Sequence, residues 1–353
     1  MGYRYIGSKE KLADTIISII RDCVPSAHTI IDLMAGTGLF SRALRQHGYN
    51  VIACDVMTYS YHHLIVNLLL NEDPPFENVL NKIEIVDQKI FSSNYEKVLV
   101  YLNSLSPKKG YFFNEFSPGG HPMNGCPPRM YFTPDNAAKI DAIRETIKHW
   151  HENDYITDKE YSLLIHTLIL SVNDVANIAG TYGHYLSHFV GRAKVDLILE
   201  PAHIDNNDNV YHEVIQGYAE DISQNLTADV CYIDPPYIKR QYAANYHILE
   251  TLARGDEPIA VGKSGLRPWR DQYSDFCSKI KIHDSLKKII NGLDCKHIFI
   301  SYSEDGLLDI SDLMAYLSQF GEVSKSDILY KRFKSNDNNN SLHIKEFLIY
   351  LRK

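Results

Sequence analysis

The stretch TIIDLMAGTGLFSRALRQHGYNVIACDV, residues 29–56, decides the fold of this 353-residue chain. An apolar strand turns through Gly36 and Gly38 into an amphipathic helix from about Leu39 to His47, and a second apolar strand ends at Asp55. This order is typical of a βαβ unit with two parallel strands. Residues 211–238 predict another strand, a short helix and then a strand from Asp229 to Ile233, and further strands are predicted near 297–303 and 346–352. The pattern predicts an α/β fold to which both ends of the chain contribute.

The middle of the chain differs from this pattern. It contains the Gly/Pro/Asn-rich stretch SPGGHPMNGCPPR (117–129), a predicted helix near 136–151 and another near 158–179. We interpret residues 91–204 as an insertion into a discontinuous α/β domain formed by residues 1–90 and 205–353. The polar run NDNNN at 336–340 fits the tip of a hairpin.

Composition excludes several classes of protein. A hydrophobic fraction of 44% and a charged fraction of 23% are close to the globular average. No run of 18 apolar residues and no signal peptide is evident, so we expect a cytoplasmic protein without a membrane partner. Six scattered cysteines form no C-x-x-C pair, and His184 and His188 make only half a metal site, so no metal is expected.

The glycine turn indicates a nucleoside cofactor. Glycines allow positive φ and close approach of a ligand, and Asp55 follows Gly38 by 17 residues, where a carboxylate can accept hydrogen bonds from both ribose hydroxyls. The turn lacks a third glycine and a G-K-[ST] sequence, which disfavours dinucleotides and P-loop ligands and favours S-adenosylmethionine. The candidate cofactor residues here are Asp32, Ala35, Gly36, Gly38 and Asp55. In the alternative reading, Asp32 and Asp55 only cap helices at a tight turn.

The sequence Asp234-Pro235-Pro236-Tyr237 is the candidate catalytic loop. It follows the apolar strand VCYI, and ligands of open α/β sheets bind at the carboxyl ends of strands. Two prolines exclude helix and ladder, so the loop presents a carboxylate, a prolyl carbonyl and an aromatic ring. Two acceptors holding both hydrogens of an exocyclic amine would turn its lone pair toward a methyl donor, while Tyr237 stacks on the base. The alternative is a rigid turn that only ends a strand.

These motifs resemble the D12 class of N6-adenine-specific DNA methyltransferases, the group that includes the Dam-type enzymes, over nearly the whole chain. The motifs that carry the resemblance are YIGSK (5–9), AGTG (35–38), DPPY (234–237), RQYAANYHILE (240–250), SYS (301–303) and YKRFK (330–334). The resemblance implies a Rossmann-like class I methyltransferase fold, with helices on both faces of a mixed sheet. The insertion would be a largely helical target-recognition region.

The resemblance also implies roles for individual residues. Tyr5 and Lys9 would meet the methionine end of S-adenosylmethionine, with Lys9 paired to its carboxylate. Asp55 would hold the ribose and Asp221 the cofactor's adenine, while Asp234 would border both cofactor and target base. The opening Asp32-Leu-Met-Ala departs from the acidic-Pro-Phe opening that is frequent in the family.

Double-stranded DNA is the expected substrate, with the target adenine flipped out of the duplex. The net charge of -8 argues against a non-specific coat, yet Lys and Arg outnumber Asp and Glu from Lys239 to Lys296. Candidate phosphate contacts are Lys239, Arg240, Lys263, Arg267, Arg270 and Arg129, and residues 255–272 are interpreted as a lid ordered by DNA. Candidate base readers in the insertion are Arg129, Tyr131, Lys139, Arg144, Tyr182, His184, Arg192 and Lys194.

The sequence therefore predicts a site-specific adenine N6-methyltransferase, the modification component of a restriction-modification system with a cognate restriction endonuclease as partner. Two alternatives stay open. One is an RNA adenine or DNA cytosine-N4 methyltransferase, although the latter more often has a Ser-Pro-Pro-Tyr pattern. The other is a DNA-binding protein that has kept the fold without turnover.

Overall fold

The computed structural model describes residues 5, 7–84, 93–206, 210–331 and 343–353. The chain folds as two compact units, each made of separate stretches of sequence. Unit 1 consists of residues 1–6, 65–207 and 243–271, and unit 2 of residues 7–64, 208–242 and 272–353. The predicted hairpin tip at 336–340 and most of YKRFK lie outside the described residues.

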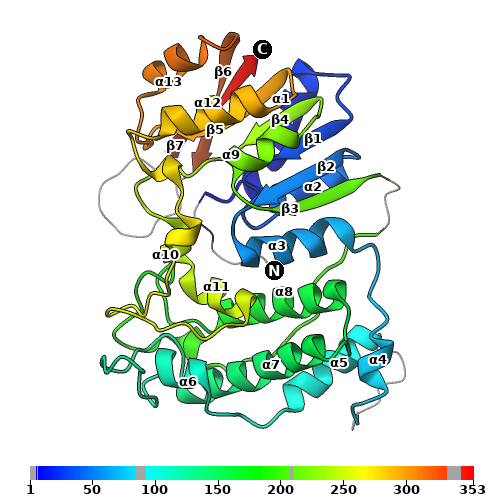
Figure 1. Cartoon of the computed structure of the whole chain (residues 1–353), viewed down its shortest axis with the longest axis vertical. Coiled ribbons are helices and arrows are strands. Elements are labelled where there is room, and N and C mark those ends of the chain that lie inside the picture. Colours follow the sequence, from blue (N-terminus) through cyan, green and yellow to red (C-terminus); the bar gives the residue numbers. More distant parts are fainter. Residues whose placement is uncertain (1–4, 6, 85–92, 207–209, 332–342) are drawn as a thin grey trace. The chain divides into compact units, whose positions relative to one another are not determined.

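Unit 2 contains a seven-stranded mixed sheet (Figure 1) with the order β3-β2-β1-β4-β5-β7-β6. Its strands are β1 (Thr29–Asp32), β2 (Asn50–Asp55), β3 (His212–Gln216), β4 (Val230–Ile233), β5 (His297–Ser303), β6 (Glu322–Lys331) and β7 (His343–Arg352). The first five strands are parallel to one another, and β7 is antiparallel to both β5 and β6. This confirms the expected Rossmann-like mixed sheet. The strand β6 had no counterpart in the sequence interpretation.

Helices cover both faces of this sheet. One layer contains α9 (Ala219–Ile222), α12 (Ile282–Gly292) and α13 (Ile310–Leu317), whose apolar residues join a core with Ile31, Cys231 and Ile298. The other face carries α1 (Ala13–Cys23), α2 (Leu39–Gln46) and α3 (Thr58–Leu64), and the Phe40 ring of α2 lies 4.2 Å from that of Tyr232 in β4. The central strands are apolar throughout because both of their faces are buried.

Unit 1 is largely helical. Its helices are α4 (Glu77–Leu80), α5 (Asn94–Ser104), α6 (Tyr111–Phe116), α7 (Pro134–Glu152), α8 (Asp158–Asp174) and α11 (His247–Arg254), with a π-helical turn at Ile65–Leu69 and a 3-10 turn at Gly191–Lys194. In Figure 1, α7 and α8 lie side by side, and α11 packs against α8. Thr133 and Thr157 cap α7 and α8 with their hydroxyls, a signal readable in the sequence. The helix α8 ends at Asp174, five residues before the predicted end at 179.

The boundaries of unit 1 differ from those predicted for the insertion. Its longest stretch begins at residue 65 rather than 91, and the unit also includes residues 1–6 and 243–271, which the sequence interpretation gave to the α/β domain. Lys159 of α8 donates a hydrogen bond to the carbonyl of Leu69, and α11 packs on α8. Long-range packing of this kind leaves no local signal in the sequence.

Candidate active site

The carboxyl ends of β1, β2, β4 and β5 meet along one edge of the sheet in unit 2. Asp32 pairs with Ala53 and Tyr232 across the ladders, so the strand ends are level. The antiparallel strand β7 begins at this edge, where Glu346 lies opposite Ser303. Ligands of open α/β sheets bind outside such an edge.

The glycine turn after β1 has the left-handed backbone that its sequence predicts. Gly36 has φ 55° and Gly38 has φ 73°, so a side chain at either position would be strained. The Ala35 amide donates to the Cys54 carbonyl at 3.0 Å, and the Gly36 amide donates to Asp55 Oδ2 at 2.8 Å. These bonds tie the turn to the end of β2 and place Asp55 beside it.

The two carboxylates of this turn have different surroundings. Asp32 is 1% exposed, and its Oδ2 accepts a hydrogen bond from the Ser41 hydroxyl at 2.6 Å. Burial raises the pKa of Asp32 to about 7. Asp55 is half-buried, and its two oxygens accept from the amides of Gly36 and Met57. A carboxylate beside a glycine turn of this kind can accept hydrogen bonds from a diol, so the turn fits a nucleoside cofactor.

The loop after β4 carries the Asp234 carboxylate next to Lys9. The Lys9 ammonium lies 3.0 Å from Asp234 Oδ1 and 5.4 Å from the centre of the Tyr237 ring. The side chains of Lys9 and Asp234 are 4% and 18% exposed. The Leu307 amide donates to the Tyr237 carbonyl at 2.9 Å, which fastens the loop to the segment after β5.

Glu346 completes this group of charges, and sequence reasoning missed it. Its Oε1 accepts a long hydrogen bond from the Tyr237 hydroxyl at 3.4 Å, and its Oε2 lies 3.8 Å from the Lys9 ammonium. The run EFLIYLR predicted a strand but gave no sign that Glu346 lies at the site. The antiparallel direction of β7 brings Glu346 to the edge of the sheet where the parallel strands end. The cluster of Lys9, Asp234, Tyr237 and Glu346 is hereafter called the acid-lysine cluster.

Burial and mutual charge shift the titration of the acid-lysine cluster. Burial lowers the pKa of Lys9, but the charges of Asp234, Tyr237 and Glu346 raise it more, so the net pKa is above its ordinary value. Burial raises the pKa of Asp234, and the contact with Lys9 offsets only part of that rise. Burial also raises the pKa of Glu346 to about 7, although Lys9 opposes this shift. Lys9 thus compensates the charge of two carboxylates, Asp234 and Glu346.

Other predicted cofactor residues have different partners. Tyr5 belongs to unit 1, where its ring stacks on Tyr246 at 4.7 Å. Asp221 lies in α9 with its side chain 67% exposed, and it forms an ion pair with Lys288. The Lys9 ammonium contacts carboxylates of the chain itself. Cofactor contacts of Tyr5, Lys9 and Asp221 therefore stay predictions.

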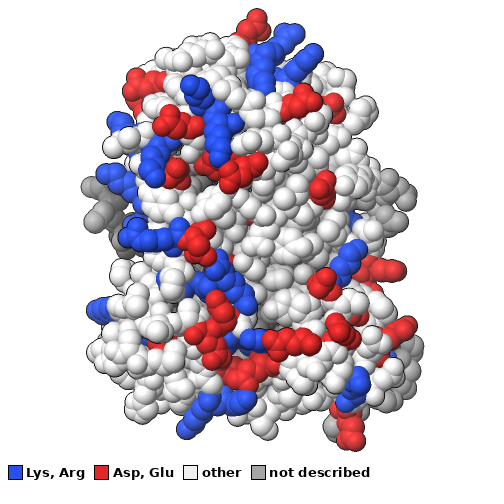
Figure 2. All heavy atoms as spheres, in the orientation of Figure 1, with Lys and Arg blue, Asp and Glu red and all other residues white. Residues whose placement is uncertain are grey.

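The candidate phosphate contacts divide into exposed and buried residues. Lys239 and Arg240 directly after the catalytic loop are exposed, as are Lys263 and Arg270 in unit 1. On the face shown in Figure 2, basic and acidic side chains are interspersed.

Two predicted phosphate contacts need correction. Arg129 has no exposed side-chain surface, and its guanidinium donates to Glu115 and to the carbonyls of Gly262 and Lys263. Arg267 is 3% exposed and forms a bidentate pair with Asp256. Both guanidinium groups are buried and paired with carboxylates inside unit 1, which disfavours their assignment as phosphate contacts. Among the candidate base readers, Tyr131, Arg144 and Tyr182 are likewise buried.

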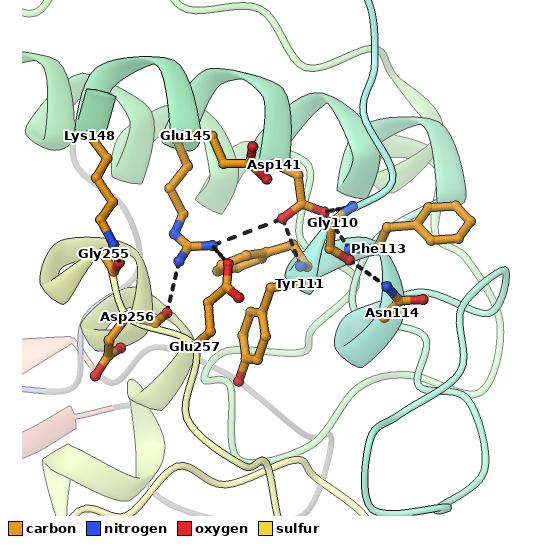
Figure 3. Close-up of polar contacts among 12 residues, drawn as sticks. Gly110, Tyr111, Phe113, Asn114, Asp141, Glu145, Lys148, Gly255, Asp256 and Glu257 are labelled. Atoms are coloured by element: carbon orange, nitrogen blue, oxygen red, sulfur yellow. Dashed lines mark hydrogen bonds and ion pairs between the residues drawn. The ribbon is translucent and has the colours of Figure 1, made fainter. Parts of the chain in front are cut away.

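Residues 255–258 are joined to α6 and α7 of unit 1 by hydrogen bonds and an ion pair, and the lid interpretation of residues 255–272 stays a prediction. In Figure 3, segment 255–257 lies against α7, where Arg144 donates to the Asp256 carbonyl at 2.8 Å and lies 3.6 Å from Glu257. Lys148 of α7 donates to the Gly255 carbonyl at 3.0 Å. Asp141 supports the neighbouring α6 by accepting from the amides of Gly110, Phe112 and Phe113. The Tyr111 hydroxyl donates to the Pro258 carbonyl at 2.7 Å.

Among the residues that the structure describes, none of the helices combines the length and apolar character needed to cross a membrane. Within those same ranges, no group of three or more His, Cys, Asp and Glu side chains is arranged to hold a metal ion.

The mixed sheet, the glycine turn and the Asp-Pro-Pro-Tyr loop together define a class I methyltransferase. A family model described as D12 class N6 adenine-specific DNA methyltransferase matches residues 5–316. The chain belongs to this family. S-adenosylmethionine is the methyl donor that membership implies.

Several proteins are similar to the chain over most of its length. Type II methyltransferase M.FokI of Planomicrobium okeanokoites is 34% identical, covering 99% of this chain and 52% of its own length. Type II methyltransferase M.NlaIII of Neisseria lactamica is 33% identical, covering 96% of this chain and 95% of its own. The chain thus spans about half of M.FokI and nearly all of M.NlaIII. A magnesium protoporphyrin IX methyltransferase from Synechocystis PCC 6803 aligns over 99% of this chain and 81% of its own, with a TM-score of 0.32 and 7% identity, too weak a likeness to add to the family match.

Proposed function

We propose that the chain methylates adenine N6 at a specific site in double-stranded DNA, as the modification component of a restriction-modification system. The family match supports the reaction, and similarity to Type II methyltransferases supports the biological setting, including a cognate restriction endonuclease as partner. The observation that carries the proposal is the position of Asp234 at the same sheet edge as the glycine turn and Asp55.

The glycine turn and Asp55 are the proposed cofactor-binding residues. S-adenosylmethionine, when bound, supplies a methyl group on a sulfonium sulfur, which keeps the electron pair of the breaking carbon–sulfur bond. Gly36 and Gly38 bring no side chain into the turn, and the Asp55 carboxylate lies beside it, where it would accept hydrogen bonds from the ribose hydroxyls. The buried Asp32 accepts a hydrogen bond from the Ser41 hydroxyl, which links the end of β1 to α2 across the turn.

The Asp-Pro-Pro-Tyr loop is the proposed binding site of the flipped adenine. Asp234 and the Pro235 carbonyl would each accept one hydrogen of the exocyclic amine, which directs the nitrogen lone pair toward the methyl group. Tyr237 would stack on the base. After transfer, N6 loses its extra proton to water, so the loop contributes positioning and electrostatics rather than a strong base.

Contacts to DNA are assigned to both units. Exposed Lys239 and Arg240 follow the catalytic loop in unit 2, and exposed Lys263 and Arg270 belong to unit 1. We propose that these four cations meet phosphates, which carry most of the affinity but no sequence information. Target recognition is assigned to unit 1, where His184 and Lys194 are exposed candidates for base contacts.

Labelled methyl transfer tests the proposal. Wild type should incorporate label from S-adenosylmethionine into unmethylated genomic DNA, and digestion followed by mass spectrometry should find N6-methyladenine. Asp234→Ala should abolish incorporation while cofactor affinity, measured by calorimetry, is retained. Asp312→Ala, an exposed aspartate of α13, is the matched control and should keep full activity.

Other results would favour the alternatives. Label in RNA alone, or N4-methylcytosine as the product, would identify a different substrate. Absence of incorporation into any nucleic acid by wild type would favour a non-catalytic DNA-binding protein.

A further inference from the structure

Glu346 is buried beside the catalytic loop but belongs to none of the motifs that define the reaction. It lies on β7, opposite Ser303 of β5 and Ile328 of β6. Its side chain is 9% exposed, and its Oε2 accepts no hydrogen bond from the described residues. A buried carboxylate of this kind is costly unless a charge compensates it.

The compensating charge is Lys9, which is shared. The ammonium donates to the Gly7 carbonyl at 3.3 Å and lies 3.0 Å from Asp234 and 3.8 Å from Glu346. Glu346 is thus within ion-pair distance of the ammonium but is not hydrogen-bonded to it, whereas Asp234 is closer. The two carboxylates therefore compete for one cation.

We propose that Glu346 is a positioning residue whose ionisation draws Lys9 partly away from Asp234, which makes the Asp234 carboxylate a stronger acceptor for the target amine. When Glu346 is protonated, Lys9 pairs with Asp234 alone and competes with the amine. When Glu346 is ionised, the ammonium is shared and Asp234 has more acceptor capacity. Glu346 Oε1 also accepts a hydrogen bond from the Tyr237 hydroxyl. The inference rests on the proposed function.

The charged and titratable groups around Glu346 set the pH range of this effect. They are Lys9 from the segment before α1, Asp234 and Tyr237 from the loop after β4, and Asp305 from the loop after β5. Burial, with the nearby Asp234 and Asp305, raises the pKa of Glu346 to about 7. The group therefore changes its charge near neutral pH.

The experiment compares single-turnover methyl transfer to duplex DNA from pH 6 to pH 8.5, roughly one to two units on either side of a neutral pKa. The wild-type rate should rise through neutrality. Glu346→Gln is similar in shape but permanently uncharged, so it should lack this rise and be about tenfold slower at high pH, with near-equal rates at low pH and little change in the KM for DNA. Glu346→Asp should restore a pH-dependent rise. Glu322→Gln, an exposed matched change on β6, should follow wild type.

A second measurement needs neither cofactor nor DNA. Infrared titration of wild type should show a protonated-carboxyl band that is lost through neutral pH, and the part due to Glu346 should be absent from Glu346→Gln. Asp32 titrates in the same range, so the assignment uses the difference between the two proteins. A Glu346→Gln pH profile that parallels wild type, or an equal loss of rate at every pH, would overturn the inference. Wild type without methyl transfer would instead overturn the proposed function.

Discussion

Replacing Lys9 by Met should destabilise unit 2 strongly at alkaline pH and weakly at acid pH. The substitution keeps much of the side-chain volume but removes the cation that lies 3.0 Å from Asp234 and 3.8 Å from Glu346. Removing one partner of a buried ion pair typically costs about 3–5 kcal/mol, because the other charge stays buried without compensation.

This loss of stability has an upper limit, because Asp234 can take up a proton instead of staying a buried anion without a cation. Protonating a carboxyl whose ordinary pKa is near 4 costs about 1.4 kcal/mol per pH unit above that value, or about 5 kcal/mol at pH 8 and about 2 kcal/mol at pH 5.5. Loss of Lys9 raises the folded-state pKa of Asp234 and Glu346 further. A raised folded-state pKa contributes stability at low pH that is lost as pH rises, so the penalty of Lys9→Met grows with pH.

Urea unfolding at pH 5.5 and pH 8 measures this difference. Far-UV circular dichroism follows both units, whereas tryptophan fluorescence reports unit 1, because Trp150 and Trp269, the two tryptophans of the chain, both belong to it. Lys287→Met, at an exposed position of α12, is the control and should be nearly neutral. A penalty below about 1 kcal/mol at pH 8, or one that is equal at the two pH values, would refute the reasoning about the shared cation.

Two further predictions concern buried charges, one in each unit. Arg129→Met should destabilise unit 1 by about 3–5 kcal/mol, because it leaves Glu115 buried without its cation. The urea midpoint measured by tryptophan fluorescence should fall, and adding Glu115→Leu to Arg129→Met should recover part of the loss. An unchanged midpoint would contradict the structural role of Arg129. From pH 6 to pH 8, the free energy of unfolding should fall less in Asp32→Asn than in wild type. The pKa of Asp32 is raised to about 7 in the folded state, so the wild-type carboxyl stabilises the fold while it is protonated and loses this contribution as the pH rises. Circular dichroism in urea would measure this, and equal losses in the two proteins would show that Asp32 does not titrate in that range.

The unit boundaries show where local pattern stops being informative. The strands of the sheet and the helices α7 and α8 follow from apolar runs and threonine caps, and the sequence placed nearly all of them. Residues 243–271 read as a continuation of the α/β domain because they directly follow the catalytic loop. Their membership of unit 1 depends on contacts such as Arg144 to Asp256 and Arg129 to Gly262, which no periodicity records.

The arginines illustrate the same limit for the candidate site. Arg129 and Arg267 have the residue type and position expected of phosphate contacts, and a cation in a Gly/Pro-rich loop is ordinarily solvated. Glu115 and Asp256 instead pair with them inside unit 1. Charge alone does not reveal burial, since burial depends on which other segments cover the side chain.

By itself, the sequence determined the glycine turn, the carboxylates at the strand ends and the Asp-Pro-Pro-Tyr loop. These features follow from local chemistry, because glycine tolerates positive φ and consecutive prolines exclude regular structure. Only the tertiary structure decided that Lys9 lies between Asp234 and Glu346, because the order of the strands and the reversed direction of β7 bring together side chains from distant parts of the chain.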